Sequence, residues 1–139
     1  MEFVCYTDWN QLPESADALF DDGSRTSIFF SRPWFENLTT TVLQDDESLL
    51  LACVVEAETV FAILPLKTHD QKHLYGLTHL YSSLYSLLLS GQNQQEILQC
   101  LAQGLDEMPM ESLRLDPVAE DDRIVQMLQQ VMEAKGYQC

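Results

Sequence analysis

The chain has 139 residues, 46% of them apolar, which suits one domain with a sizeable core and excludes a wholly disordered protein. Seven basic residues against 22 acidic ones give a net charge of −15, which argues against nucleic acid and anionic membranes as partners. The longest apolar run, residues 49–55, is far shorter than the roughly 20 residues of a membrane-spanning helix. The first nine residues resemble no signal peptide. We therefore expect one cytoplasmic domain, residues 1–139.

The first third of the chain predicts a strand followed by two helices. Residues 2–6 alternate in the manner of a strand. A helix is expected to begin after Asp8, near position 12 or 13, and to end at the turn residues 21–24. After a short apolar segment, Ser31 as a cap and Pro33 in the first turn predict a second helix. Its buried face should carry Phe35, Leu38 and Val42.

Residues 48–67 predict two central β-strands joined by a tight turn at positions 56–58. Side chains alternate across a strand, and here both faces are apolar, so the hairpin should lie centrally in a sheet covered by helices on both faces. Pro65 has no N–H and should end the hydrogen-bonded ladder on its edge.

The second half predicts a strand over residues 73–80, bent at Gly76, and a helix over residues 92–108. A short strand over 112–116 and a helix over 120–135 should follow, and residues 137–139 resemble the first step of another strand. A strand, helix, strand, helix order is typically completed by a further strand. We therefore expect these residues to form the N-terminal part of a longer protein.

Candidate functional side chains are few. Tyr81 and Tyr85 lie among serines in a polar-aromatic patch that either lines a ligand cleft or forms a strand with its hydroxyls in water. Trp34 either packs in the core or lines a pocket. The acidic pairs at 21–22 and 121–122 lie at expected turns and helix starts, which favours caps and solvated charge over acid–base catalysis. Scattered cysteines and histidines predict neither a disulfide framework nor a metal site.

The order of elements resembles the GNAT acyltransferase fold. Residues 30–34 (FSRPW) are similar to the F-x-S-x-x-W helix entrance of the cellulose-biosynthesis (CelD-like) branch, and residues 60–66 resemble its strand that ends in P-L. Residues 113–117, the helix after them and the Gly-Tyr that follows fit the stretch before its second half. The resemblance implies an α/β (α+β) fold with a mixed, largely antiparallel sheet and helices on both faces, forming an incomplete half of a tandem.

In such tandems the resemblance implies that acetyl-coenzyme A is held mainly by the second half. Where GNAT enzymes carry the phosphate-cradling motif Q/R-x-x-G-x-G/A, this chain reads SGQNQQ at residues 90–95, with one glycine. We therefore assign no cofactor-binding and no catalytic residue. The predicted function is the N-terminal GNAT-like domain of an acyltransferase, incomplete alone, which forms one wall of a substrate cleft or scaffolds a C-terminal catalytic half. Trp34, Tyr81 and Tyr85 are the candidates for that wall.

Two other functions stay open. One is a stand-alone acidic interaction module, dimeric or bound to a partner through its unfinished sheet edge and without enzymatic activity. The other is a complete small acetyltransferase for a cationic amine, which suits the charge but not the missing phosphate loop.

Overall fold

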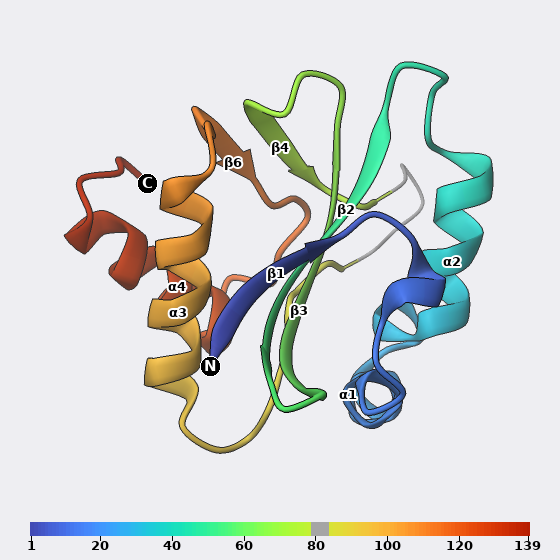
Figure 1. Ribbon diagram of the computed structural model, residues 1–139, viewed down its shortest axis with the longest axis horizontal. Coiled ribbons are helices and arrows are strands. Elements are labelled where there is room, and N and C mark those ends of the chain that lie inside the picture. Colours follow the sequence, from blue (N-terminus) through green and yellow to red (C-terminus); the bar gives the residue numbers. More distant parts are fainter. Residues whose placement is uncertain (79–83) are drawn as a thin grey trace.

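The computed structural model describes residues 1–78 and 84–139, which form one six-stranded sheet between helices (Figure 1). The strands are β1 (Glu2–Tyr6), β2 (Ser48–Glu56), β3 (Thr59–Thr68), β4 (His73–Gly76), β5 (Leu88–Leu89) and β6 (Ser112–Arg114). The helices are α1 (Ala16–Thr26), α2 (Arg32–Thr41), α3 (Gln94–Glu107) and α4 (Arg123–Ala134), with short 3-10 helices at Trp9–Gln11 and Ile28–Phe30. The sheet order is β1-β2-β3-β4-β6, and β5 pairs with β3.

The central hairpin has the predicted form. All residues of β2 between its two end positions are buried, and β2 pairs with β3 along its whole length. The strands are joined at Ala57 and Glu58, whose φ angles of 47° and 67° lie in the left-handed region. Tight hairpin turns require this conformation because it matches the twist of the strands. The pairings within the sheet are antiparallel except that between β4 and β6.

Helices cover both faces of the sheet, as the doubly apolar hairpin predicts. Helices α1 and α2 lie on one side and α3 on the other, with α4 packed against α3 (Figure 1). The predicted apolar stripe of α3 is entirely buried; it comprises Ile97, Leu98, Leu101, Ala102 and Leu105. A Cβ added to Gly104 would lie 2.0 Å from Cγ of Phe3. Glycine is therefore needed at this position so that α3 can approach β1.

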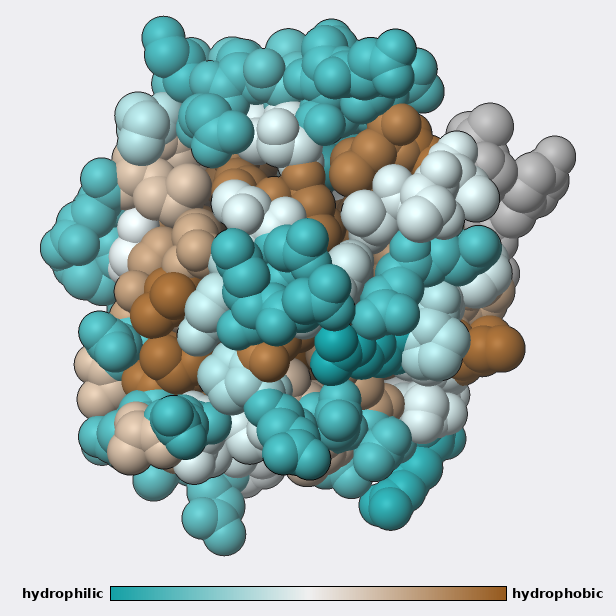
Figure 2. Space-filling view, turned by 45° about the vertical axis from the view of Figure 1, so that its right-hand side comes forward, coloured by the Kyte–Doolittle hydropathy of each residue, from teal (hydrophilic) through white to brown (hydrophobic). Residues whose placement is uncertain are grey.

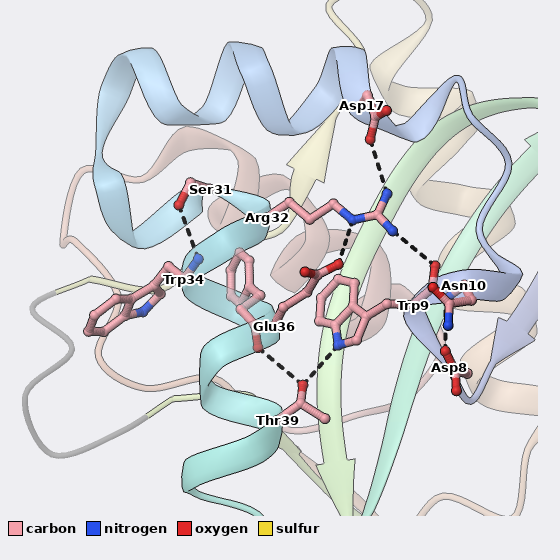
Figure 3. A network of polar contacts seen from close by, with 10 residues as sticks. Asp8, Trp9, Asn10, Asp17, Ser31, Arg32, Trp34, Glu36 and Thr39 are labelled. Carbon is pink, nitrogen blue, oxygen red and sulfur yellow. Dashed lines mark hydrogen bonds and ion pairs between the residues drawn. The ribbon is translucent and has the colours of Figure 1, made fainter.

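A polar network joins α1 and α2 to the N-terminal 3-10 helix (Figure 3). The guanidinium of Arg32 lies 2.8 Å from Glu36 and 3.0 Å from Asp17, and its third nitrogen donates to the carbonyl of Trp9. The indole N–H of Trp9 donates to Oγ1 of Thr39 at 2.8 Å. Partial burial lowers the pKa of Arg32, but the two carboxylates outweigh this effect and raise it overall. Because all three guanidinium nitrogens are engaged, this network fastens the helices together.

The edge of β3 that faces away from β2 is interrupted. Gly76 of β4 pairs with Leu66, whereas Leu88 of β5 pairs with Ile63. Between these two pairs β3 advances by three positions and the residue numbers opposite it by twelve, so the pairing is not continuous along this edge. The interruption lies at Pro65, whose carbonyl accepts from Leu77 N–H and which has no N–H of its own to return. The ladder on this edge ends as predicted, although β3 itself continues to Thr68.

Helix α1 extends beyond its predicted end. The turn expected at residues 21–24 is wrong, since the helix continues to Thr26. A Cβ on Gly23 would lie 2.8 Å from a methyl carbon of Leu88 and 3.0 Å from the carbonyl oxygen of Phe30. The close approach that this glycine allows outweighs its low helix propensity.

The expected strand at residues 137–139 is also absent from the structure. Gly136 has a φ of 100° and ends α4, and the N–H of Tyr137 donates back to the carbonyl of Met132. The hydroxyl of Tyr137 then donates to Asp106 on α3 at 2.8 Å. These contacts fold the last residues back onto the helical layer.

Polar side chains cover much of the face seen in Figure 2, and apolar residues reach the surface in patches between them. Within residues 1–78 and 84–139, no helix is long and apolar enough to cross a bilayer.

Candidate functional site

The parallel pair β4–β6 gives the sheet a natural place for a ligand. In sheets with parallel strands, ligands bind in crevices outside the carboxyl ends of the strands. Here β4 and β6 are followed by the segments 84–89 and 119–124, and both segments line one cavity of about 410 Å³. Helix α1 and the 3-10 helix before α2 complete its wall. We call this cavity the carboxyl-end crevice.

The crevice has an apolar wall and a charged rim. Its apolar wall comes from five leucines and three other side chains: Leu19, Phe30, Leu84, Leu87, Leu88, Leu89, Ala119 and Ile124. Its polar side chains are Asp22, Thr26, Ser86, Asp122 and Arg123. Such a lining suits a ligand with an apolar body and a few polar groups.

Each rim carboxylate also has a local partner. Asp122 caps α4, because its Oδ1 accepts from the N–H of Val125 at 3.0 Å. Asp22 pairs with Arg25 one turn later at 3.2 Å, and both side chains are exposed, so the pair is screened by water. The pair at 121–122 lies at the predicted helix start, whereas Asp21 and Asp22 lie inside α1 and not at the expected turn, with both side chains exposed. No sequence pattern predicts that Asp22 and Asp122 lie at one cavity; the topology of the fold brings them there.

Of the residues predicted to form a cleft wall, Tyr85 lies in the core with 1% exposure. Its hydroxyl donates to the carbonyl of Pro65, its ring packs edge-on against Phe35 with centroids 6.3 Å apart, and burial raises its pKa. A Cβ on Gly76 would lie 3.0 Å from the same ring. The neighbours Leu84 and Ser86 line the crevice, whereas the ring of Tyr85 fills the space over Gly76.

The other two predicted residues are not brought to this crevice. Trp34 is half-buried and meets Phe29 edge-to-face at 4.9 Å, and its indole points away from the Arg32 network (Figure 3). Tyr81 lies outside the described residues. A role for Trp34, Tyr81 and Tyr85 in a substrate cleft stays a prediction.

The turn between β5 and α3 contains residues 90–93, the stretch that the resemblance to GNAT enzymes compares with their pyrophosphate-binding motif. Asn93 caps α3 in a left-handed conformation, with φ of 55°, and its side chain makes no capping bond. Glu96 adds a negative charge in the first turn, and no lysine or arginine occurs between Lys72 and Arg114. The N–H groups of a helix start favour an anion, but this turn supplies neither the glycines nor a cation. The residues present do not fit the cofactor.

A second cluster of titratable groups lies at the amino ends of β4 and β6. Nδ1 of His73 is 2.7 Å from Asp70, and Nε2 is 3.4 Å from Glu111. The other oxygen of Asp70 accepts from the N–H groups of His73 and Lys72. The backbone N–H of His73, then its ring and the N–H of Lys72, hold the pKa of Asp70 well below its usual range. This arrangement fixes the β3–β4 turn; in the part of the chain described, no group of three such side chains could hold a metal ion.

Comparison with known proteins supports the fold. No protein-family model and no curated protein sequence matches the chain. Among solved structures, it is similar to an aminoglycoside acetyltransferase from an uncultured soil metagenomic sample, determined in complex with sisomicin. The match has a TM-score of 0.51 at 15% sequence identity and covers 99% of this chain and 91% of the other.

At this identity the likeness concerns the arrangement of the backbone. It agrees with the mixed, largely antiparallel sheet and the helices described above, and it favours no particular branch such as the CelD-like one. The chain has a GNAT-like fold.

Proposed function

We propose that this chain is the acceptor-binding GNAT-like unit of an acyltransferase, incomplete without a second unit that holds the acyl-coenzyme A. The carboxyl-end crevice is its acceptor site. The observation that carries the proposal is the cavity of about 410 Å³ lined by the segments 84–89 and 119–124, which come after β4 and β6 in the chain, in a fold shared with an acetyltransferase. The reaction class is transfer of an acyl group from a thioester to an amine nitrogen.

The charge of the crevice and of the chain favours a cationic acceptor. Asp22 and Asp122 lie at its rim, and the chain carries a net charge of −15. An ammonium group would be attracted to both carboxylates, while its hydrocarbon part would lie on the leucines of the wall. Arg123 in the same rim would repel an ammonium group that comes close to it, so further amines of a polyamine would have to extend away from the crevice into the solvent. The acceptor class is therefore an amine with an apolar portion.

The lack of a phosphate cradle supports the claim of incompleteness. Glu96 lies beside the β5–α3 turn, and no lysine or arginine is near it in the sequence. Pyrophosphate would therefore bind weakly at this turn. A C-terminal half in tandem, of the kind found in the CelD-like branch, would supply the cofactor site.

Calorimetry and NMR titration of the whole 139-residue chain test the proposal. Acetyl-coenzyme A should not bind tightly, whereas spermidine should shift the amides of residues 84–89 and 119–124. Replacing Asp22 and Asp122 by asparagine should weaken spermidine binding about threefold to tenfold, since each screened carboxylate contributes about 0.2–1 kcal/mol. Asparagine also caps helices well, so Asp122→Asn leaves α4 intact.

Asp46→Asn is the matched control. It removes one charge from the exposed loop before β2 and should leave spermidine binding unchanged. If no cationic amine shifts the crevice amides, the acceptor site is wrong. Tight binding of acetyl-coenzyme A, or acetylation of spermidine by the isolated chain, would instead show a complete enzyme and refute the need for a second unit.

A second candidate is a stand-alone acidic interaction module. The observation that favours it is the position of β6, which ends the sheet order and pairs only with β4 among the described strands. An edge strand offers its unpaired N–H and C=O groups to another chain. Light scattering distinguishes a homodimer from a monomer, and a monomer would require a different protein as the partner.

A further inference from the structure

The outer side of β6 opens onto a groove of about 620 Å³ between this strand and α4. Its walls are formed by β6 and the residues beside it, by α4, and by the last four residues of the chain. The residues that line it are Met110, Glu111, Ser112, Leu113, Leu115, Val125, Leu128, Gln129, Met132, Gly136, Tyr137, Gln138 and Cys139. We call it the β6–α4 groove. Among the described residues, it shares none with the carboxyl-end crevice.

The groove combines an open strand edge with an apolar floor. Leu113 and Leu115 are only half-buried, and because they are two residues apart in an extended segment they point to the same side. On α4, Val125, Leu128 and Met132 recur at three- and four-residue spacing and line the opposite wall. An extended chain laid along β6 could pair with its backbone and place alternate side chains between these two walls.

The charge of the surroundings selects the partner. Glu111, just before β6, is the one charged side chain among the described residues that line the groove, and its side chain is 61% exposed. The single basic residue of β6, Arg114, is 3.4 Å from Asp116 and so is already paired. A second copy of this chain would bring another net charge of −15 to the same edge. Charge complementarity favours a basic segment instead.

We propose that the β6–α4 groove binds an extended, basic segment of another protein, which adds to the sheet as a strand beside β6. Apolar side chains at alternate positions of that segment lie against α4, and the lysine or arginine side chains between them extend from the other face into the solvent. A basic residue at the end of the segment reaches Glu111. This interaction stands whether or not the crevice binds an amine, because the two surfaces are separate.

The probe is a capped seven-residue peptide that alternates lysine and valine, titrated into the full chain at mildly alkaline pH. We expect saturable binding that weakens with salt and slows hydrogen exchange at residues 112–115. The same alternation with glutamate in place of lysine should bind at least about tenfold more weakly.

Two variants locate the contact. Glu111→Lys should weaken binding of the lysine peptide about threefold to tenfold. Asp46→Lys, the same charge reversal in the loop before β2, should leave binding of this peptide unchanged. Leu115→Lys should abolish binding, provided that its thermal transition stays close to that of the unchanged chain. Equal binding of both peptides, unchanged exchange at residues 112–115, or a homodimer that β6 variants dissolve would each overturn the proposal.

Discussion

The two edges of β3 are built in different ways. Toward β2, the ladder runs the whole length of both strands apart from a bulge at Val54 and Val55. Toward β4 and β5, it consists of two short pieces separated by the interruption at Pro65. One edge is held by regular backbone hydrogen bonds, and the other by side chains that fill the break.

The difference explains where the crevice lies. A continuous strand beside β3 would pair through positions 62–67 and leave no space at the sheet. Instead, the chain leaves at Leu77, and the ring of Tyr85 occupies the resulting gap over Gly76. The N–H of Tyr85 donates to the carbonyl of Pro117, which attaches the departing segment to the chain after β6. The interrupted edge is therefore the part of the sheet that can be shaped for a ligand.

Removal of the Tyr85 ring from the interrupted edge should lower the free energy of unfolding the most. Tyr85→Ala empties a fully buried site between β3, β4 and α2 and should lower the free energy of unfolding by about 3–5 kcal/mol. Tyr85→Phe loses only the hydrogen bond to the carbonyl of Pro65, which still accepts from the N–H of Leu77. This variant should lower the free energy of unfolding by about 1 kcal/mol. Urea denaturation measures both. Equal costs for the two variants would mean that the ring does not fill the break.

A methyl group at Gly76 should have the next largest effect. Its Cβ would lie 3.0 Å from the ring of Tyr85, so Gly76→Ala should cost about 1–3 kcal/mol through overpacking. In a Tyr85→Leu background the ring is absent, and the same substitution should cost less. Urea denaturation of the four proteins gives the coupling energy, and a coupling near zero would separate Gly76 from the ring.

Pro65→Ala should have an effect toward the lower end of the same range, again on the interrupted edge. The new N–H would point toward the break, where the chain opposite has left the strand, and a buried donor without a partner costs about 1–3 kcal/mol. Hydrogen exchange locates the change: amides of residues 74–77 should exchange faster, and those of β2 should not. Stabilisation, with new protection around residue 77, would show that proline does not cause the break.

The regular edge could be predicted from the sequence, and the interrupted one only in part. The β2–β3 hairpin and the α3 stripe follow from local alternation and local periodicity, which need no knowledge of distant residues. Pro65 marks the position of the break by its missing N–H. The burial of Tyr85 at this break could not be derived from the sequence, because several of its neighbours along the chain are polar or aromatic residues. The partner of its buried hydroxyl is the carbonyl of a residue twenty positions earlier.

The crevice itself had no sequence signal. Asp22 and Asp122 each have a sufficient local role, one beside Arg25 and the other as a helix cap. Only the packing of α1 at Gly23 against β5 brings the first of them to the cavity. The same packing explains why the predicted end of α1 at residues 21–24 is wrong: Gly23, expected to break the helix, instead lets α1 pack closely on Leu88 of β5.

The smallest effect is expected at the turn that begins the interrupted edge, and it depends on pH. The N–H groups of His73 and Lys72, together with the imidazole of His73, depress the pKa of Asp70 in the folded protein. A depressed carboxyl pKa contributes stability that is fully present above the unfolded value of about 4 and is lost as the pH falls through the folded value. Asp70→Asn should therefore destabilise the protein slightly near neutral pH and remove this part of its acid sensitivity.

Hydrogen exchange between neutral pH and about pH 3 should show β4 losing protection before β2 in the unchanged chain, because only β4 starts at this carboxylate. If β2 and β4 lose protection together, Asp70 does not hold the weaker edge by itself, and the two sides of β3 unfold as one unit.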